Sequence, residues 1–156
     1  MSGTYKTGYA DFGDPDPMSG YAFDTKIAVI LRDDLAAWQR VNATAFLASG
    51  VAHSFPQLMG ESYEDADGTT YLPMFGQPVF VLEGDADALR ELRTRAIGRG
   101  VATSVFTGDL FQTGNDEDNR AAVRAVDGSG LDVVALAVHG PKNVVDRIVK
   151  GTRRHP

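Results

Sequence analysis

Four short runs of apolar residues divide the chain from about residue 26 onward. Each run has the length of a strand and is closed by charged or small residues, which is typical of a strand covered on both faces. Apolar residues recur at helical spacing after each run, so we expect strands that alternate with helices in a layered α/β domain. The expected strands are Ile27–Leu31, Pro78–Glu83, Val101–Phe106 and Leu131–Val138.

A helix is expected after each strand. The first, over about Leu35–Ala52, has apolar residues at i, i+3, i+7 and i+10, and this spacing predicts its buried face. The residues on that face are Trp38, Val41, Ala45 and Ala48. The second helix is expected to run from an N-cap at Asp85 to a stop at Gly100.

Two stretches lack a clear period. Residues 55–76 mix turn signals with a short strand candidate at Thr69–Pro73, and we expect a hairpin with a long excursion there. Residues 1–24 are rich in Gly, Asp, Pro and Ser with scattered Tyr and Phe, which predicts a flexible or docking N-terminal arm. The predicted organisation is therefore this arm followed by a single α/β domain over residues 25–156.

Composition narrows the classes of function. The 156 residues include no cysteine, which excludes disulfides, thiolate metal sites and cysteine nucleophiles. No segment approaches the ~20 apolar residues that span a bilayer, and the N-terminus lacks a secretory pattern, so we expect a cytoplasmic protein without a membrane partner. The net charge of −6, half of it from the arm, argues against a nucleic-acid partner.

Several stretches are characteristic when they are taken together. One set is Asp65–Gly68, Tyr71–Met74, Phe106–Thr107, Leu110–Gly114 and Asn119–Arg120. On these, the chain is identified as a member of the uncharacterised bacterial family of domain of unknown function 2000. A second set is Lys26–Arg32, Gln77–Leu82 and Leu136–Pro141, which resembles peptidyl-tRNA hydrolase II. The resemblance implies a three-layer α/β/α fold with a mixed, mostly parallel sheet like that of the hydrolase.

The resemblance to the hydrolase also implies site residues. The loop after Val101–Phe106 keeps an Asp and a Thr at the family's spacing, which makes Asp109 and Thr113 the candidate catalytic residues. The family's lysine-rich stretch corresponds to residues 39–41, where only Arg40 is positively charged. Its guanidinium is a planar fork and not the point charge of a lysine, and it becomes a candidate substrate-binding residue.

Polar residues also follow the expected strands. In an open α/β sheet, ligands bind beyond the carboxyl ends of strands, where the strand order reverses. Arg32 follows the first strand, and Thr107 and Asp109 follow the third. If these two strands are adjacent, Arg32, Asn42, Asp109 and Thr113 are expected to converge on a cleft for a small, peptide-like ligand.

The same residues also fit structural roles. Asp34 can cap the first helix, Asp109 can fix a turn, and Arg32 can pair with an exposed acid. Tyr71 fits either a lid over the cleft or the hydrophobic core, and the core is favoured. His139 has no evident partner, no two histidines have metal-ligand spacing, and we expect neither a metal nor a cofactor.

Three functions are consistent with these residues. The first is a small hydrolase or acyl-transfer-like enzyme that acts on an amide or ester of an amino-acid-like substrate. In it, Asp109 is the acid or base, Thr113 a hydrogen-bond donor, and an arginine the anion anchor. The second is a non-catalytic homodimer that holds a small metabolite or peptide end. The third is a degenerate peptidyl-tRNA hydrolase, which rests on the fold resemblance alone.

Overall fold

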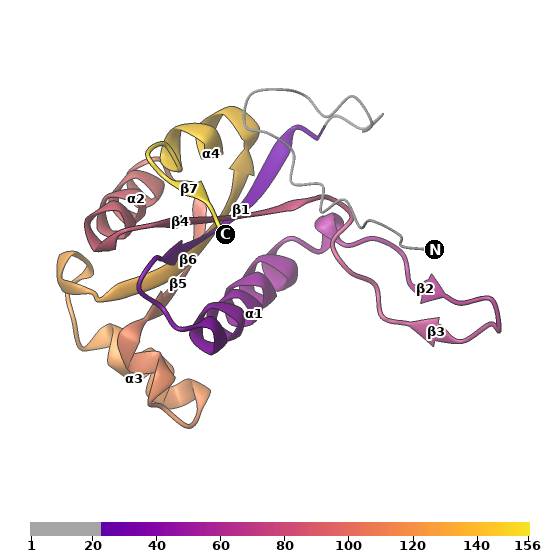
Figure 1. The fold of residues 1–156 in the computed structure, drawn as a ribbon, viewed down its shortest axis with the longest axis horizontal. Helices are drawn as coiled ribbons and strands as arrows, with labels where there is room; N and C mark the ends of the chain where they lie inside the picture. The colour runs from indigo at the N-terminus through magenta and orange to yellow at the C-terminus, as the bar shows by residue number, and fades with distance from the viewer. Residues whose placement is uncertain (1–22) are drawn as a thin grey trace.

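A five-stranded sheet forms the centre of the fold, with the strand order β5-β6-β1-β4-β7 (Figure 1). The computed structural model describes residues 23–156, so the expected N-terminal arm lies almost wholly outside the described residues. The strands are β1 (Thr25–Arg32), β4 (Val79–Gly84), β5 (Ala102–Thr107), β6 (Val133–Pro141) and β7 (Arg153–Arg154). The first four match the apolar runs, and β7 was not expected.

The sheet is mixed, but its pairing is not mostly parallel. β1 and β4 pair in parallel, whereas β6 is antiparallel to both β1 and β5, and β7 is antiparallel to β4. The expectation of mostly parallel pairing was wrong because β6 returns beside β5. The helix between them, α3 (Asp116–Arg124), lies at one end of the sheet and does not carry the chain across a face (Figure 1).

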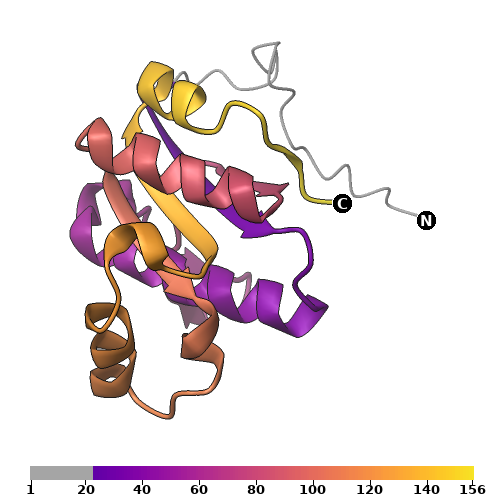
Figure 2. The same cartoon turned by 90° about the vertical axis from the view of Figure 1, so that its left-hand side faces the viewer.

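Helices cover both faces of the sheet, which gives three layers. They are α1 (Ala37–Ser54) on one face and α2 (Ala86–Gly98) with α4 (Lys142–Ile148) on the other (Figure 2). Alternate residues of β1 serve the two layers, since Val29 packs in the core beneath α1 and Ile30 in the core beneath α2 and α4. None of the helices in residues 23–156 is long and apolar enough to cross a membrane.

The ends of the helices follow local signals in the sequence. Asp85 is the N-cap of α2, and its side chain accepts a hydrogen bond from the backbone N–H of Ala88 at 2.8 Å. Asn115 caps α3 in the same way. Gly100 follows α2 with a φ of +65°, a conformation that glycine adopts without strain. The expected N-cap and stop of α2 are confirmed.

The buried face of α1 differs from the expected one. Its buried side chains are Ala43, Leu47 and Val51, whereas Trp38 and Val41 are 59% and 69% exposed. The expectation was wrong because α1 has apolar residues on two opposite sides, and spacing alone does not say which side meets the sheet. The second apolar side faces outward.

Residues 59–76 form a projecting hairpin that leaves the C-terminal end of α1 (Figure 1). Its strands are β2 (Tyr63–Glu64) and β3 (Thr70–Tyr71). Its base is closed by the N–H of Gly60, which donates to the carbonyl of Met74 at 2.8 Å. The expected hairpin is confirmed, but Tyr71 is 54% exposed. The favoured placement of Tyr71 in the core was therefore wrong, because the hairpin extends away from the sheet.

Candidate functional site

The carboxyl ends of β1, β4 and β5 lie at the same end of the sheet. β1 and β4 are parallel, and β5 points the same way because β6 is antiparallel to both β1 and β5. After β1 the chain enters α1 on one face, and after β4 it enters α2 on the opposite face. The adjacent ends of β1 and β4 are therefore the switch point at which open α/β sheets commonly bind ligands.

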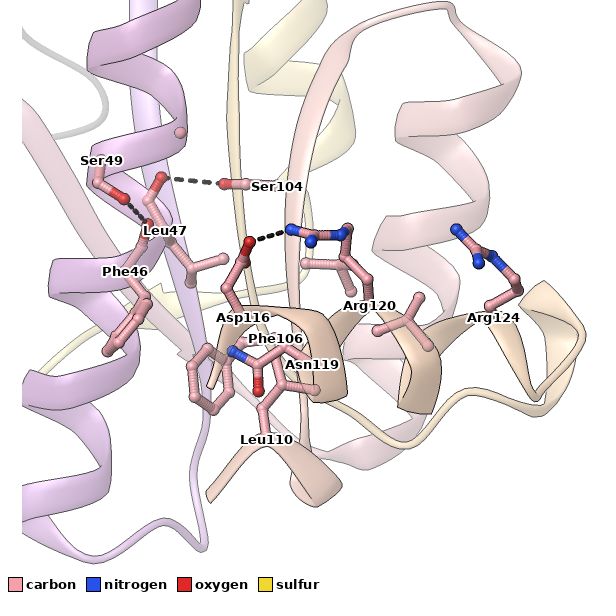
Figure 3. Close-up of a pocket in the computed structure, with 13 residues that line it drawn as sticks. Phe46, Leu47, Ser49, Ser104, Phe106, Leu110, Asp116, Asn119, Arg120 and Arg124 are labelled. Carbon is pink, nitrogen blue, oxygen red and sulfur yellow. Dashed lines mark hydrogen bonds and ion pairs between the residues drawn. The ribbon is translucent and has the colours of Figure 1, made fainter. Parts of the chain in front are cut away.

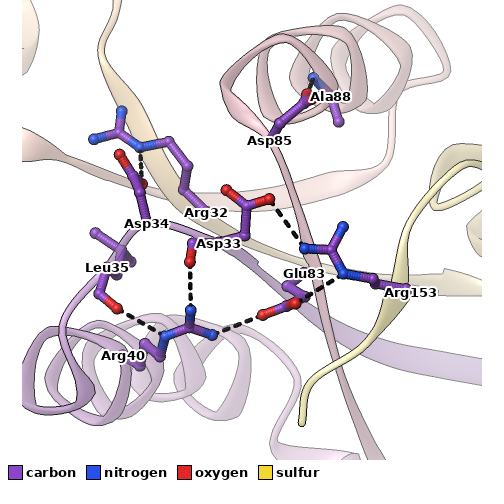
Figure 4. A network of polar contacts seen from close by, with 9 residues as sticks. All are labelled: Arg32, Asp33, Asp34, Leu35, Arg40, Glu83, Asp85, Ala88 and Arg153. Carbon is purple, nitrogen blue, oxygen red and sulfur yellow. Dashed lines mark hydrogen bonds and ion pairs between the residues drawn. The ribbon is translucent and has the colours of Figure 1, made fainter.

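A network of charged side chains occupies this switch point (Figure 4). Arg40 Nη1 donates to Glu83 Oε2 at 2.8 Å. The other nitrogens of Arg40 donate to the backbone carbonyls of Asp33 at 2.6 Å and Leu35 at 2.9 Å. Arg153 in β7 donates from Nε to Glu83 Oε1 at 2.9 Å and from Nη2 to Asp33 Oδ2 at 3.0 Å. Both carboxylate oxygens of Glu83 are thus paired.

The electrostatics of Glu83 agree with a structural role. Its side chain is only 8% exposed. The hydrogen bond from Arg40 lowers the pKa of Glu83 below its usual value and outweighs the opposing effect of burial, and the charge of Arg153 lowers it further. Glu83 is therefore ionised at neutral pH, and the guanidinium of Arg40 is engaged by protein groups on several sides.

Arg32 lies at the same edge in a separate set of ion pairs. Its Nε donates to Asp34 Oδ1 at 2.6 Å, and its Nη1 donates to Asp132 Oδ1 at 2.7 Å. Partial burial disfavours its charge, but these two hydrogen bonds raise the pKa of Arg32 above its usual value. Asp34 serves this pair and does not cap α1, whose first turn is closed by the Gln39 side chain accepting from the N–H of Ala36 at 2.9 Å.

The loop after β5 holds the other expected polar residues. Asp109 is exposed in the short helix η2 (Gly108–Phe111), and its carboxylate has no hydrogen bond or ion pair within residues 23–156. The Thr113 hydroxyl lies 3.1 Å from the carbonyl oxygen of Leu110 and within hydrogen-bonding reach of the Asn119 side chain. The Thr107 hydroxyl is buried, with no partner among the described residues.

The polar residues that follow the first and third predicted strands were expected to converge on one cleft if those strands, β1 and β5, were adjacent. They are not adjacent. β6 lies between β1 and β5, which leaves Arg32 paired with Asp34 and Asp132 at one strand end and Asp109 in the loop of another. Asn42 is exposed on α1. Tyr71 lies in the projecting hairpin, where its hydroxyl donates to Asp65 Oδ2 at 2.8 Å. The hairpin leaves the C-terminal end of α1, whereas η2 lies near the N-terminal end (Figure 1).

The N-terminal end of α1, where the sequence suggested a counterpart of the hydrolase lysines, packs through aromatic side chains. The ring of Trp38, in the first turn of α1, meets the ring of Phe111 edge-on with 5.4 Å between centroids. Phe111 in turn lies 4.8 Å from the ring of Phe106. These contacts pack η2 against the start of α1. Arg40 lies on the inner side of the same helix, against Glu83.

An open groove of about 590 Å³ lies between α1 and α3 (Figure 3). Its floor is the β5 segment 104–106, and its apolar walls include Phe46 from α1, Leu110 from η2 and Val123 from α3. The rings of Phe46 and Phe106 are 6.0 Å apart in an edge-on arrangement. This volume is within the usual range of about 300–1,000 Å³ for small-molecule sites.

The charged groups of this groove all lie on α3, and Ser49 and Ser104 add hydroxyl groups from α1 and β5. From α3 the groove is lined by Asp116, Asn119, Arg120 and Arg124, and of these Arg124 lies farthest from Phe46 and Phe106 (Figure 3). Arg120 pairs with Asp116 one turn earlier in the helix. Arg124 has no ion pair or hydrogen bond in the described part of the chain. The groove thus combines an apolar floor with a guanidinium that is available to an anion.

Sequence reasoning missed this groove because it looked only at strand ends. A signal was present, since three of the stretches that resemble the family lie around it. They are Phe106–Thr107, Leu110–Gly114 and Asn119–Arg120. No periodicity places these stretches beside the second half of α1, because that neighbourhood is formed only when β5 and η2 pack on the helix.

Metal chemistry has no candidate centre in residues 23–156, where no group of three His, Cys, Asp or Glu side chains is placed to hold an ion. His139 is 7% exposed, and neither ring nitrogen has a partner among the described residues. Its ring packs against Phe55 with centroids 4.3 Å apart. Burial lowers the pKa of His139 below its usual value, so the ring is neutral at physiological pH.

The fold and the groove define the class of the protein: a three-layer α/β domain with an open, ligand-sized groove at the edge of a mixed sheet. Residues 25–156 match the family described as "Protein of unknown function (DUF2000)". The chain therefore belongs to this family, as the sequence motifs predicted. The likeness to peptidyl-tRNA hydrolase II stays a prediction from the sequence.

A solved structure supports the same placement. A protein of unknown function from Agrobacterium tumefaciens strain C58 is 41% identical to this chain, with a TM-score of 0.85. The match covers 86% of this chain and 100% of that one. No curated protein matches the chain. The two chains share a fold, and neither description names a reaction, so function has to be argued from the site.

Proposed function

We propose that this chain is a cytoplasmic, non-catalytic binding protein that holds a small molecule or peptide-like ligand in the groove between α1 and α3. The observation that carries the proposal is the free guanidinium of Arg124 at one end of an apolar, ligand-sized groove. A ligand with an apolar body and a carboxylate or similar anion at one end fits this arrangement. The apolar part supplies affinity, and the guanidinium selects the orientation.

The polar neighbours of Arg124 support an anionic ligand. Arg120 lies one turn away, but its ion pair with Asp116, which also lines the groove, offsets its charge, so Arg124 supplies the positive charge for an anion. The amide of Asn119 adds a hydrogen-bonding group. The dimeric form expected from the sequence is not part of this proposal.

A hydrolase or acyl-transfer enzyme is supported less well. Such an enzyme needs Asp109 and Thr113 to act together on a substrate, but the Thr113 hydroxyl already has the Leu110 carbonyl and the Asn119 side chain within reach. No histidine bonds to either residue among the described contacts. Turnover of an amino-acid ester that is abolished by Asp109→Asn would favour the enzyme.

Action on tRNA has the weakest support. The chain carries a net charge of −6, and a tRNA ligand needs several cations in contact with phosphates. The corner that holds lysines in peptidyl-tRNA hydrolase II contains the Trp38–Phe111 contact, with Arg40 engaged by Glu83. Nothing at this corner offers an extended basic surface.

Two fluorescent probes test the binding function. Anilinonaphthalene sulfonate has an apolar body with an anion, and phenylnaphthylamine has a similar body without one. We expect both probes to bind the folded wild type. Arg124→Gln should weaken binding of the sulfonate probe by roughly five- to tenfold, which corresponds to about 1–1.4 kcal/mol for one hydrogen bond in an open groove. The neutral probe should bind the variant unchanged.

Arg99→Gln is the matched control, because Arg99 is an exposed arginine that follows α2 and does not line the groove. This variant should bind both probes like the wild type. The proposal fails if neither probe binds the folded wild type, or if Arg124→Gln and Arg99→Gln bind the sulfonate probe equally well.

A further inference from the structure

Exposed apolar side chains are concentrated on two surfaces of the molecule. Ten large apolar side chains of residues 23–156 are exposed, and seven of them lie on α1 or on the projecting hairpin. On α1 they are Trp38, Val41 and Phe46, and on the hairpin they are Tyr63, Tyr71, Leu72 and Met74. Clusters of exposed large apolar side chains on a folded domain commonly mark an interaction site.

The outward face of α1 lacks charge altogether. Arg40 is the one Asp, Glu, Lys or Arg in the 18 residues of this helix, and it points inward to Glu83. Small residues, among them Ala45 and Ser49, lie between the larger ones and are exposed. A surface helix normally carries charged residues on its solvent side, and a helix that is apolar on opposite sides is covered on both. Close approach of another helix is compatible with the small residues.

Hydrogen bonds to Asp65 hold the turn of the projecting hairpin. Asp65 Oδ1 accepts hydrogen bonds from the N–H groups of Asp67 at 2.9 Å and Thr69 at 3.0 Å, and Oδ2 accepts one from the Tyr71 hydroxyl. The bond from Thr69 is the main reason why the pKa of Asp65 is lowered. Yet Leu72 is 83% exposed, and an isolated two-stranded hairpin is marginally stable in water. The hairpin therefore needs a surface on which to pack.

We propose that a second copy of this chain packs antiparallel along α1, so that the projecting hairpin of each copy covers the outward face of α1 in the other. The hairpin leaves α1 at its C-terminal end (Figure 1), whereas Trp38 and Val41 lie near the N-terminal end. An antiparallel pairing brings these two ends together. The same contact is then made twice about a two-fold axis, as in most homodimers.

The available area suits a dimer. Seven side chains that are each more than half exposed offer roughly 700 Å² of apolar surface per copy, at about 150–250 Å² for a fully buried aromatic side chain. A stable interface buries ~800 Å² on each partner. The two surfaces together, and neither one alone, approach this value.

This interface goes beyond the proposed binding function, although the two touch at Phe46. Phe46 is exposed on α1 and also lines the groove. The partner copy therefore lies beside the open mouth of the groove. Because Arg124 lies on α3 and outside the interface, ligand binding and dimerisation can fail independently, and the probe experiments and the mass measurements report on them separately.

Light scattering on the full chain tests the dimer. The wild type is expected at twice 16.7 kDa at micromolar concentration. Val41→Glu and Leu72→Glu should each give the single-chain mass with an unchanged circular dichroism spectrum, because both side chains are exposed within one copy. Ile97→Glu on α2 is the matched control, since Ile97 is 56% exposed on the opposite layer, and this variant should stay dimeric.

Cysteine substitutions test the arrangement, because the chain has no cysteine of its own. Trp38→Cys and Leu72→Cys are prepared as separate proteins, mixed and oxidised. We expect a disulfide between the two variants that neither forms alone to the same extent. A monomeric wild type, which would leave the surface to another segment or another protein, overturns the proposal. So does a Val41→Glu or Leu72→Glu variant that remains dimeric, or a mixture without the cross-link.

Discussion

At the scale of single residues, the network around Glu83 is the most informative contact in the molecule. Arg40, Glu83 and Arg153 come from α1, β4 and β7, and they join three separate parts of the chain at the end of the sheet. The predicted resemblance to peptidyl-tRNA hydrolase II placed Arg40 at a lysine-rich stretch of that hydrolase, which suggested a ligand anchor. The tertiary structure pairs it with a carboxylate 43 residues away, and this contact has consequences for stability.

Glu83→Gln is expected to lower the free energy of unfolding at pH 7 by about 2 kcal/mol. Removing one partner of a fully buried ion pair costs about 3–5 kcal/mol, but Arg153 is 61% exposed and solvent screens its share. The pKa of the Glu83 carboxyl is lowered in the folded state, so its contribution is complete above the ordinary value of 4.5 and is lost as the pH falls through the folded pKa.

Urea denaturation from neutral to acidic pH measures this difference between wild type and variant. It should stay constant down to about pH 5 and shrink below that. Glu91→Gln is the control, because the Glu91 side chain is 64% exposed and pairs with Arg95 one turn along α2. It should cost less than about 0.5 kcal/mol. Equal effects of the two substitutions would contradict a structural role for Glu83.

At the scale of elements, local signals fixed where helices begin and end, but not which side of a helix is buried. Asp85 and Asn115 cap α2 and α3 through hydrogen bonds to nearby N–H groups, and such contacts need no tertiary structure. In α1 one apolar side, with Ala43 and Leu47, is buried, and a second apolar side, with Trp38 and Val41, faces outward. The larger side chains suggested the wrong face.

Two glycines at the end of α2 give a test with opposite signs. Gly100 has a φ of +65°, so Gly100→Ala is expected to lower the free energy of unfolding by about 1 kcal/mol. Gly98 is the last helical residue, has no positive φ, and has nothing within 4 Å of an added Cβ. Gly98→Ala should raise the free energy of unfolding by about 0.5–1 kcal/mol. Thermal or urea unfolding of the two variants measures these changes in the free energy of unfolding. A change of the same sign in both variants would contradict this account.

At the scale of the whole molecule, the order of the strands decides which surfaces exist. β6 enters between β1 and β5, separates their carboxyl ends, and leaves β5 at the edge of the sheet beside α1 and α3. The groove is a consequence of this order, and so is the distance between Arg32 and the loop with Asp109. Within residues 23–156, both hydrophobic cores are built from residues 27 onward.

Deletion of residues 1–22 is therefore expected to leave a domain that unfolds cooperatively, with a melting midpoint within about 4 °C of the full chain, or ~1 kcal/mol for a domain of this size. The first strand and both core clusters are retained. The Asp24 carbonyl, which accepts from the N–H of Lys142 at 2.9 Å, is retained as well. Scanning calorimetry is the measurement, and a broad, non-cooperative transition would show that residues 1–22 complete the core.

The sequence by itself determined the alternation of strands and helices, the helix caps, the hairpin in residues 55–76 and the family. These properties depend on contacts between residues that are close in the chain, or on apolar runs that require burial wherever they lie. The strand Ile27–Leu31 can be predicted from the sequence because its residues are all apolar, and in the structure all five are buried.

Only the tertiary structure decided the direction and order of the strands, the buried side of α1 and the place of the site. Whether β6 lies beside β5 or beyond β1 depends on long-range packing, and a buried strand has the same apolar sequence in either direction. The pairing of Arg40 with Glu83 and the presence of Phe46 and Arg124 along the same groove depend on that order. Contacts between distant segments are set by the sum of many weak packing terms, and no short stretch of sequence contains that sum.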